Sequence, residues 1–210
     1  MNCKKSKSII WVGRFIKCKH PEFALEAAKR LREKGFDFSM TFIGDGPERK
    51  GCENYAQTHL QGADVKFLGS MKPDDVRRHM EESSIFIFTS DRYEGWGAVL
   101  GEAMNSGCAV IASHSCGSAP YLIEQNINGR VYRYGDMQSF CSSLEDYLTD
   151  AQLVRTLGFN AYNTMADLWN VECAVPRLIQ IIKSMIAGVP FPHYATGPCS
   201  SAGFIKDNWL

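Results

Sequence analysis

The stretch Ser8-Ile9-Ile10-Trp11-Val12-Gly13 decides the fold, because this short apolar run ends at a glycine and leads into a helical pattern. Pro21 opens that pattern, apolar residues then recur at helical spacing, and Gly35 ends it. A second apolar run follows at 38–43. An apolar strand, a crossover helix and another apolar strand are typical of a parallel α/β sheet. We therefore predict such a sheet.

The same alternation continues along the chain. Strands buried on both faces are expected at 8–13, 38–43, 65–68, 85–89 and 109–112, with an edge strand at Gly129–Tyr132. Helices are expected from Pro21 to just before Gly35, from Pro47 toward Leu60, from Pro73 toward Glu82, from Gly97 to near Gly107, and then at 137–148, 151–168 and 171–187. The predicted fold class is α/β: a Rossmann-like parallel sheet with helices on both faces and closing helices at the C-terminus.

The size and composition of the chain fit one globular domain. Its 210 residues are 45% hydrophobic and 22% charged, close to the averages of soluble proteins. We predict a Rossmann-like domain with its closing helices over 1–189. We expect an irregular tail over 190–210, which holds three prolines and two glycines and has no hydrophobic period. The 23 basic and 23 acidic residues cancel, so no nucleic-acid partner is indicated.

The cysteines and the N-terminus bear on location. The eight cysteines, Cys3 among them, are scattered without the spacing of metal ligands. We therefore expect reduced thiols and a cytoplasmic protein. The apolar run at 9–13 is too short for a signal peptide, and no run is long enough to span a bilayer. Contact with the inner face of a membrane stays open, since a surface can lie on lipid without a spanning segment.

Two cations follow the first strand. Arg14 comes directly after it, and Lys19 comes just before the helix that Pro21 opens. Open α/β sheets bind ligands at the carboxyl ends of their strands, where helix N-termini offer amide groups and a positive dipole. Two cations there suit a diphosphate, because each charge-assisted hydrogen bond contributes about 1.5–3 kcal/mol. An ordinary surface position explains either cation equally well when it is taken alone.

Glycines and carboxylates follow two other strands. The turn Gly44-Asp45-Gly46-Pro47 lets the backbone approach a ligand, although a tight strand-to-helix turn selects the same residues without one. Glu94 lies in the loop after the 85–89 strand, and Glu102 lies in the next helix with seven residues between the two. Carboxylates accept hydrogen bonds from sugar hydroxyls. The spacing favours a binding role for Glu102 over a solvated helix face.

Several spaced motifs form one ordered set. They are Val12-Gly13-Arg14-Phe15 with Lys19, Ile43-Gly44-Asp45-Gly46-Pro47, Phe67-Leu68-Gly69, Glu94-Gly95-Trp96-Gly97, Glu102-Ala103-Met104 and Val110-Ile111-Ala112. In this order they resemble the C-terminal domain of the retaining glycosyltransferases of family four, which have the GT-B fold. The resemblance covers roughly residues 8–148, and so many spaced matches rarely coincide by chance.

The resemblance implies transfer of a sugar from a nucleoside-diphosphate sugar, linked to UDP or GDP, to an acceptor hydroxyl with retention of configuration. Arg14 and Lys19 would hold the diphosphate, Glu94 the sugar hydroxyls and Glu102 the ribose. The implied catalytic residues are Arg14, Lys19 and Glu94, and the implied donor-binding residues are Gly13, Gly44, Gly46, Ser70, Met71, Gly95, Trp96, Gly97, Ala98, Val99 and Glu102. Ser70 and Met71 match the place of the nucleobase. No cofactor is expected, and the lack of an Asp-x-Asp motif predicts a metal-independent enzyme.

The sequence also departs from the family pattern. Tyr121 replaces a carboxylate that the family often has, and Trp96 stands where phenylalanine is common. Cys18-Lys19-His20 replaces the usual lysine–glycine step. This last change bears directly on the reach of Lys19.

The expected partners follow from the same resemblance. Family members place an acceptor-binding domain before this one, whereas this chain starts almost directly with the first strand. We expect a nucleotide sugar as ligand, and either an N-terminal acceptor-binding domain or a separate acceptor-binding subunit as partner. Peripheral contact with a membrane through that partner stays open. Polysaccharide or cell-envelope glycan synthesis is where such enzymes commonly work.

Two other interpretations stay open. The first is a donor-binding subunit that is inert alone, which exposed apolar surface around Phe159, Tyr162, Leu168 and Trp169 would favour. The second is a nucleotide-sugar epimerase or a phosphorylase of the same architecture. The Glu94–Glu102 pair favours a transferase over an epimerase, and no lysine-rich cofactor site indicates a phosphorylase.

Overall fold

The computed structural model describes residues 4–203, 205 and 209–210 of the chain. The predicted thiol of Cys3 and part of the predicted tail lie outside these residues. The described chain forms a six-stranded sheet in the order β3-β2-β1-β4-β5-β6, and each pairing is parallel. The strands are β1 Lys5–Val12, β2 Ser39–Ile43, β3 Asp64–Phe67, β4 Ser83–Phe88, β5 Ala109–Ser113 and β6 Gly129–Tyr132. The predicted parallel α/β fold is confirmed.

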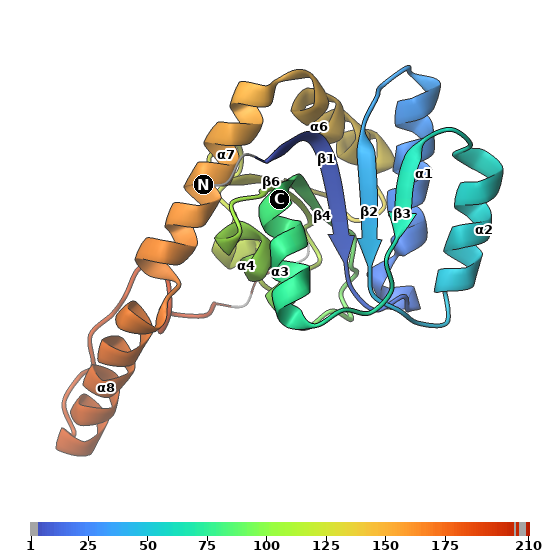
Figure 1. Cartoon of the computed structure of the whole chain (residues 1–210). Helices are drawn as coiled ribbons and strands as arrows, with labels where there is room; N and C mark the ends of the chain where they lie inside the picture. The colour runs from blue at the N-terminus through green and yellow to red at the C-terminus, as the bar shows by residue number, and fades with distance from the viewer. Residues whose placement is uncertain (1–3, 204, 206–208) are drawn as a thin grey trace.

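Helices cover both faces of the sheet (Figure 1). They are α1 Pro21–Glu33, α2 Arg49–His59, α3 Pro73–Glu82, α4 Ala98–Asn105, α5 Ala119–Leu122, α6 Met137–Thr149, α7 Ala151–Asn163 and α8 Val171–Ala187, with a 3-10 turn η1 at Lys17–Lys19 and a π-helical turn η2 at Thr164–Leu168. One core lies between the sheet and α1, α2 and α6, and the other between the sheet and α3, α4 and α5. The α7 helix contributes to both cores, through Val154 and Leu157 on one side and Ala161 on the other.

The central strands separate these two cores. Along β1, Ile9 and Trp11 pack into the first core and Ile10 into the second, because successive side chains of a strand point to opposite faces. Every residue of β4 and β5 is buried. This explains why these strands read as continuous apolar runs in the sequence rather than as alternating ones.

The prediction that the 65–68 strand is buried on both faces is wrong. β3 lies at an edge of the sheet and has only β2 as a neighbour. Its residues alternate between exposed and half-buried. β6 forms the opposite edge, as predicted for Gly129–Tyr132, and most of its residues are buried.

Several predicted boundaries shift. β1 begins at Lys5 rather than Ser8. Its first residues are exposed and polar, so they did not belong to the apolar run from which the strand was predicted. α2 begins at Arg49 rather than Pro47, since a turn closed by the Arg49 N–H to the Gly46 carbonyl (3.1 Å) comes first. The helix predicted at 151–168 divides into α7 and η2. The short elements η1 and α5 were not predicted.

The α8 helix projects away from the sheet (Figure 1). None of its residues is buried, and Val175, Ile179, Ile182 and Ile186 are exposed at helical spacing. The described part of the tail forms no helix or strand and returns to α8, where Arg177 donates to the Thr196 carbonyl at 2.6 Å. None of the described helices combines the length and hydrophobicity that crossing a bilayer requires.

Candidate functional site

A cavity of about 830 Å³ lies at the carboxyl ends of β1, β2 and β4. The strand order reverses there, because the chain runs outward from β1 to β2 and β3 and then continues with β4 on the other side of β1. Open α/β sheets bind ligands at such a switch point. The predicted site residues that line the cavity are Gly13, Arg14, Lys19, Gly44, Ser70, Met71, Glu94, Gly97, Ala98, Val99 and Glu102. The structure therefore brings both proposed cations and both proposed carboxylates to one cavity.

The loops after β1 and β2 pack tightly against each other. The Gly13 N–H donates to the Ile43 carbonyl at 3.0 Å, and the Phe15 N–H donates to the Asp45 carbonyl at 2.9 Å. Gly44 has φ +130°, and a Cβ atom there would lie 1.9 Å from the Gly13 carbonyl oxygen. Contact between the two loops therefore requires glycine at position 44, with or without a ligand.

Lys19 and Glu94 form an ion pair within the lining of the cavity. Their side chains are only 14% and 15% exposed, so water and salt screen this pair less than a surface pair. Ser90 Oγ also donates to Glu94 Oε2 at 3.2 Å, and Lys19 Nζ lies 5.5 Å from the centroid of the Phe88 ring. Burial lowers the pKa of Lys19 from its ordinary value. Because an ammonium group has three donors, Lys19 can hold Glu94 and still bind an anionic ligand.

Hydrogen bonds fix the backbone of η1, which carries Lys19. Thr89 Oγ1 donates to the Lys19 carbonyl at 2.6 Å and accepts from Trp11 Nε1 at 2.9 Å. The Asp91 N–H donates to the Cys18 carbonyl at 3.0 Å. These bonds join η1 to the loop after β4, which carries Glu94. The ion pair thus forms between two segments that are already held together.

The α4 helix begins at the cavity. Gly97 is its N-cap, with φ 75° and ψ 57°, and a Cβ atom there would lie 2.8 Å from the Phe88 ring and 2.9 Å from Cys116 Sγ. The chain can turn into α4 this close to β4 only with glycine at this position. The first turn of α4 therefore faces the cavity, and Glu102 lines it from further along the helix. A helix N-terminus so placed favours an anionic ligand.

Three residues predicted for the site, Gly46, Gly95 and Trp96, do not line this cavity. A Cβ atom on Gly46 would meet the Phe15 carbonyl oxygen at 2.4 Å, so this glycine also serves the packing of two loops. The Gly95 carbonyl accepts from the Gly117 N–H at 3.1 Å. The centroid of the Trp96 ring lies 5.7 Å from that of Tyr121 and 5.8 Å from that of Trp169. Trp96 and Tyr121, which both depart from the family pattern, therefore pack against each other.

Sequence reasoning missed the wall that α3 contributes. Asp74, Val76, Arg77 and Met80 line the cavity from this helix, and Arg77 adds a third cation. The sequence carried a signal for them, because these residues recur at helical spacing directly after the predicted site residue Met71.

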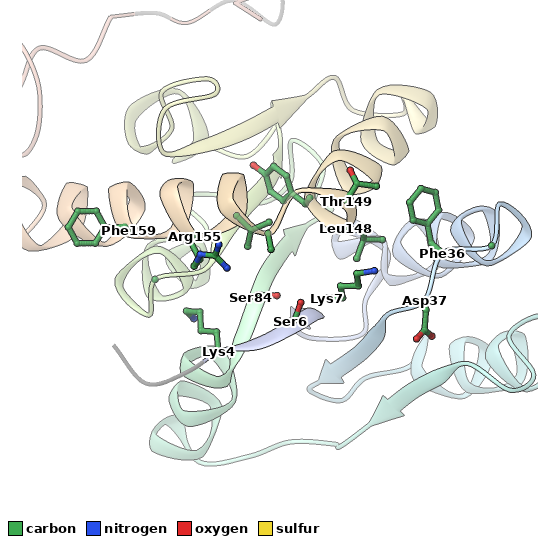
Figure 2. Close-up of a pocket in the computed structure, with 15 residues that line it drawn as sticks. Lys4, Ser6, Lys7, Phe36, Asp37, Ser84, Leu148, Thr149, Arg155 and Phe159 are labelled. Carbon is green, nitrogen blue, oxygen red and sulfur yellow. The ribbon is translucent and has the colours of Figure 1, made fainter.

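A second cavity, of about 900 Å³, lies at the amino ends of the strands (Figure 2). Lys4, Lys7 and Arg155 lie around it. Lys4 Nζ already donates to the carbonyls of Met80 at 3.0 Å and Ser83 at 2.7 Å, which satisfies most of its donors within the protein. Of the residues that the structure describes in its lining, one is a carboxylate, Asp37, which pairs with Arg32 rather than with a cation of this cavity. The candidate site is therefore the cavity at the carboxyl ends.

The fold is that of the C-terminal domains of GT-B glycosyltransferases, as two solved structures show. HepE from Anabaena, solved in complex with UDP, has a TM-score of 0.72 at 21% identity, covering 88% of this chain and 49% of that chain. The C-terminal domain of a glycosyl transferase group 1 family protein from Francisella tularensis has a TM-score of 0.68 at 24% identity, covering 78% and 87%. At these identities the likeness shows the fold alone.

Sequence comparison gives the family. The sequence model of the family described as Glycosyl transferases group 1 matches residues 2–164, and the chain belongs to this family. Spore coat protein SA of Bacillus subtilis is 30% identical over 161 residues, covering 72% of this chain and 42% of that protein. The amylovoran biosynthesis glycosyltransferase AmsK of Erwinia amylovora is 31% identical over 145 residues, covering 65% and 34%. The chain thus spans less than half the length of these relatives.

Proposed function

We propose that residues 1–189 form the donor-binding half of a retaining glycosyltransferase of family four. In this proposal a nucleoside-diphosphate sugar binds in the cavity at the carboxyl ends of the strands, and its sugar is transferred to an acceptor hydroxyl. The observation that carries the proposal is the meeting of Arg14, Lys19, Glu94 and Glu102 around one cavity. HepE, which shares the fold, was solved with UDP and with UDP-glucose, so UDP is the first nucleotide to test here.

The proposed chemistry follows from where charge develops. The leaving diphosphate gains negative charge as the glycosidic bond breaks, so Arg14 and Lys19 bind it more strongly in the transition state than in the ground state. The first turn of α4 adds amide donors and a positive dipole. Glu94 accepts hydrogen bonds from sugar hydroxyls, and Glu102 accepts them from the ribose. The cations neutralise the leaving group without a metal or a cofactor.

A second candidate is a donor-binding subunit that transfers sugar only against a separate acceptor-binding chain. The observation in its favour is exposed apolar surface on the closing helices: Phe159 is 54% exposed and Tyr162 is 40% exposed. Leu168 and Trp169, which were expected to belong to the same surface, are half-buried, and Trp169 packs against the core on the α4 side. The α8 helix carries further exposed apolar residues, among them Ile179 and Ile182. Large exposed apolar patches mark interaction sites in soluble proteins.

The setting is also part of the proposal. We place the protein in the cytoplasm, where its partner half can contact the inner face of the membrane, and assign it to polysaccharide or cell-envelope glycan synthesis. The similarity to a glycosyltransferase of amylovoran biosynthesis supports that assignment.

Calorimetry with UDP, GDP, UDP-glucose and GDP-mannose tests donor binding, and an assay of nucleoside diphosphate release tests turnover. Binding together with release by this chain alone would support the transferase and would show that no separate acceptor-binding half is needed. Binding without release supports the donor-binding subunit. If none of these four ligands binds, and a wider panel of nucleotide sugars gives no thermal shift, the proposed function is wrong.

A further inference from the structure

His20 has an unusual backbone conformation for its residue type. It follows Lys19 directly and has φ 47° and ψ 53°, in the left-handed region. Glycine occupies this region at little cost, and the family pattern has glycine at this step, whereas a residue with a side chain is strained there. His20 also serves as the N-cap of α1 without a side-chain capping bond. Its ring is therefore available for other contacts.

The ring of His20 joins three separate segments. Nδ1 lies 2.7 Å from Glu22 Oε1 on α1, and Nε2 lies 2.9 Å from Asp91 Oδ2 in the loop after β4. The Tyr134 hydroxyl, in the segment after β6, lies 2.9 Å from the same Nε2. A carboxylate faces each ring nitrogen, and a neutral imidazole would present a lone pair to one of the two carboxylates. Only the imidazolium form donates to both.

These contacts connect the two halves of the ion pair in the cavity. His20 adjoins Lys19 in sequence, and its partner Asp91 lies in the loop after β4, three residues before Glu94. The backbone of Asp91 bonds to Cys18 at the same place. The His20 ring thus adds a charge-dependent bond to the contact between η1 and this loop.

We propose that His20 is a positioning residue, whose charged ring fastens the loop bearing Glu94 to the turn bearing Lys19 and so holds both donor-binding side chains in place. The fastening is a property of the free protein. Its effect on ligand binding rests on the proposed function.

The sign of the pH dependence follows from the surroundings of the ring. Burial opposes its charge, but the hydrogen bonds with Asp91 and Glu22 outweigh burial and raise the pKa of His20 above its ordinary value. The charged and titratable groups that face the ring are Glu22, Asp91 and Tyr134. A raised folded-state pKa means that the contribution is complete below the ordinary value of about 6.5 and is lost as pH rises through the raised value.

The first test needs no ligand. Amide hydrogen exchange of segments 17–20 and 90–97 is compared at about pH 6 and about pH 8.5, each rate being corrected for intrinsic exchange. We expect the protection of wild type to fall several-fold at the higher pH. His20→Gly, which suits the left-handed backbone, should show the low protection at both pH values. His193→Gly, on the tail, is the matched control and should behave as wild type. Equal protection in wild type and His20→Gly at the lower pH would overturn the proposal.

A second variant separates charge from shape. Asp91→Asn keeps a side chain of the same shape but removes one carboxylate from the ring. We expect the NMR titration of His20 to move to lower pH and the loss of protection to move with it. A purely structural role would leave the pH of that loss unchanged, which would also overturn the proposal.

The second test measures UDP affinity by calorimetry at the same two pH values. The protonation of UDP itself changes with pH in the same way for both proteins. The ratio of wild-type to His20→Gly affinity therefore reports only the effect of the protein. We expect wild type to bind about three- to tenfold more tightly at the lower pH and about equally at the higher pH. The same ratio at both pH values would contradict the proposed effect on donor binding. Wild type that binds no UDP at either pH would count against the proposed function, while hydrogen exchange still decides the role of His20.

Discussion

Lys19 is the side chain on which diphosphate binding should depend most. Its ammonium is only slightly exposed and already holds one carboxylate, so it is oriented before a ligand arrives. A charge-assisted hydrogen bond is worth about 1.5–3 kcal/mol, so we expect Lys19→Met to weaken UDP binding by about 10- to 100-fold in calorimetry. Lys17→Met is the matched control, because Lys17 lies in the same turn η1 but is exposed and does not line the cavity. Equal losses in both variants would contradict the role given to Lys19.

The two carboxylates of the cavity should separate the sugar from the ribose. In the proposed roles, Glu102→Ala weakens UDP and UDP-glucose alike, by about tenfold for one lost charged hydrogen bond. Glu94→Ala should leave UDP affinity within a few-fold and mainly erase the preference for UDP-glucose. Isothermal titration of both ligands against both variants measures this. The assignment of roles is wrong if the two variants show the same ratio of the two affinities.

The position of His20 illustrates what a single sequence hides at this scale. Its ring partners Asp91 and Tyr134 lie 71 and 114 positions away in the chain. Local pattern carries no information on which loops meet at the carboxyl edge of a sheet. What the sequence did carry was the departure from a lysine–glycine step, and the left-handed backbone at His20 is the structural counterpart of that departure.

Among the secondary-structure elements, the loops after β1 and β2 approach most closely at Gly44. Gly44→Ala would place a methyl group 1.9 Å from the Gly13 carbonyl oxygen, in a backbone region that disfavours side chains. We expect a loss of about 2–4 kcal/mol in the free energy of unfolding, measured by urea denaturation. Gly51→Ala is the control, since Gly51 lies in α2 with no atom within 4 Å of a new Cβ. This substitution should stabilise by up to about 1 kcal/mol. A Gly44→Ala variant as stable as wild type would contradict the loop contact.

The elements that the sequence predicted well share a physical cause. α1 and α3 begin at Pro21 and Pro73 as predicted, because proline fixes φ and needs no donor at the first helical position. β4 and β5 were recognisable because burial on both faces selects mainly apolar residues. β3 reads Asp64-Val65-Lys66-Phe67, so charged and apolar residues alternate along it just as its exposure does at the sheet edge. The prediction of a strand buried on both faces overlooked this alternation.

The candidate site was predictable where its residues follow a strand, and not where they come from a helix face. Residues in motifs that follow a strand were identified, since the carboxyl ends of parallel strands meet at one edge. The wall from α3 was missed because it comes from a helix face rather than from a strand end. Gly46, which does not line the cavity, instead allows the close contact of two loops, and glycine suits both purposes equally. Residue type alone cannot separate the two.

At the scale of the whole molecule, donor binding should stabilise the fold without a metal. A ligand that binds only the folded state adds about 2.7 kcal/mol at one hundred times its Kd. For a chain of this size, that raises Tm by about 5–10 °C. We expect UDP to produce such a shift, and an excess of EDTA to leave it unchanged, because Arg14, Lys19 and the first turn of α4 line the cavity and offer donors to the diphosphate. Differential scanning fluorimetry with UDP, with and without EDTA, measures both effects. Lys19→Met should lose most of the shift. A shift that disappears in EDTA and returns with Mg²⁺ or Mn²⁺ would mean that a metal, and not these side chains alone, neutralises the diphosphate.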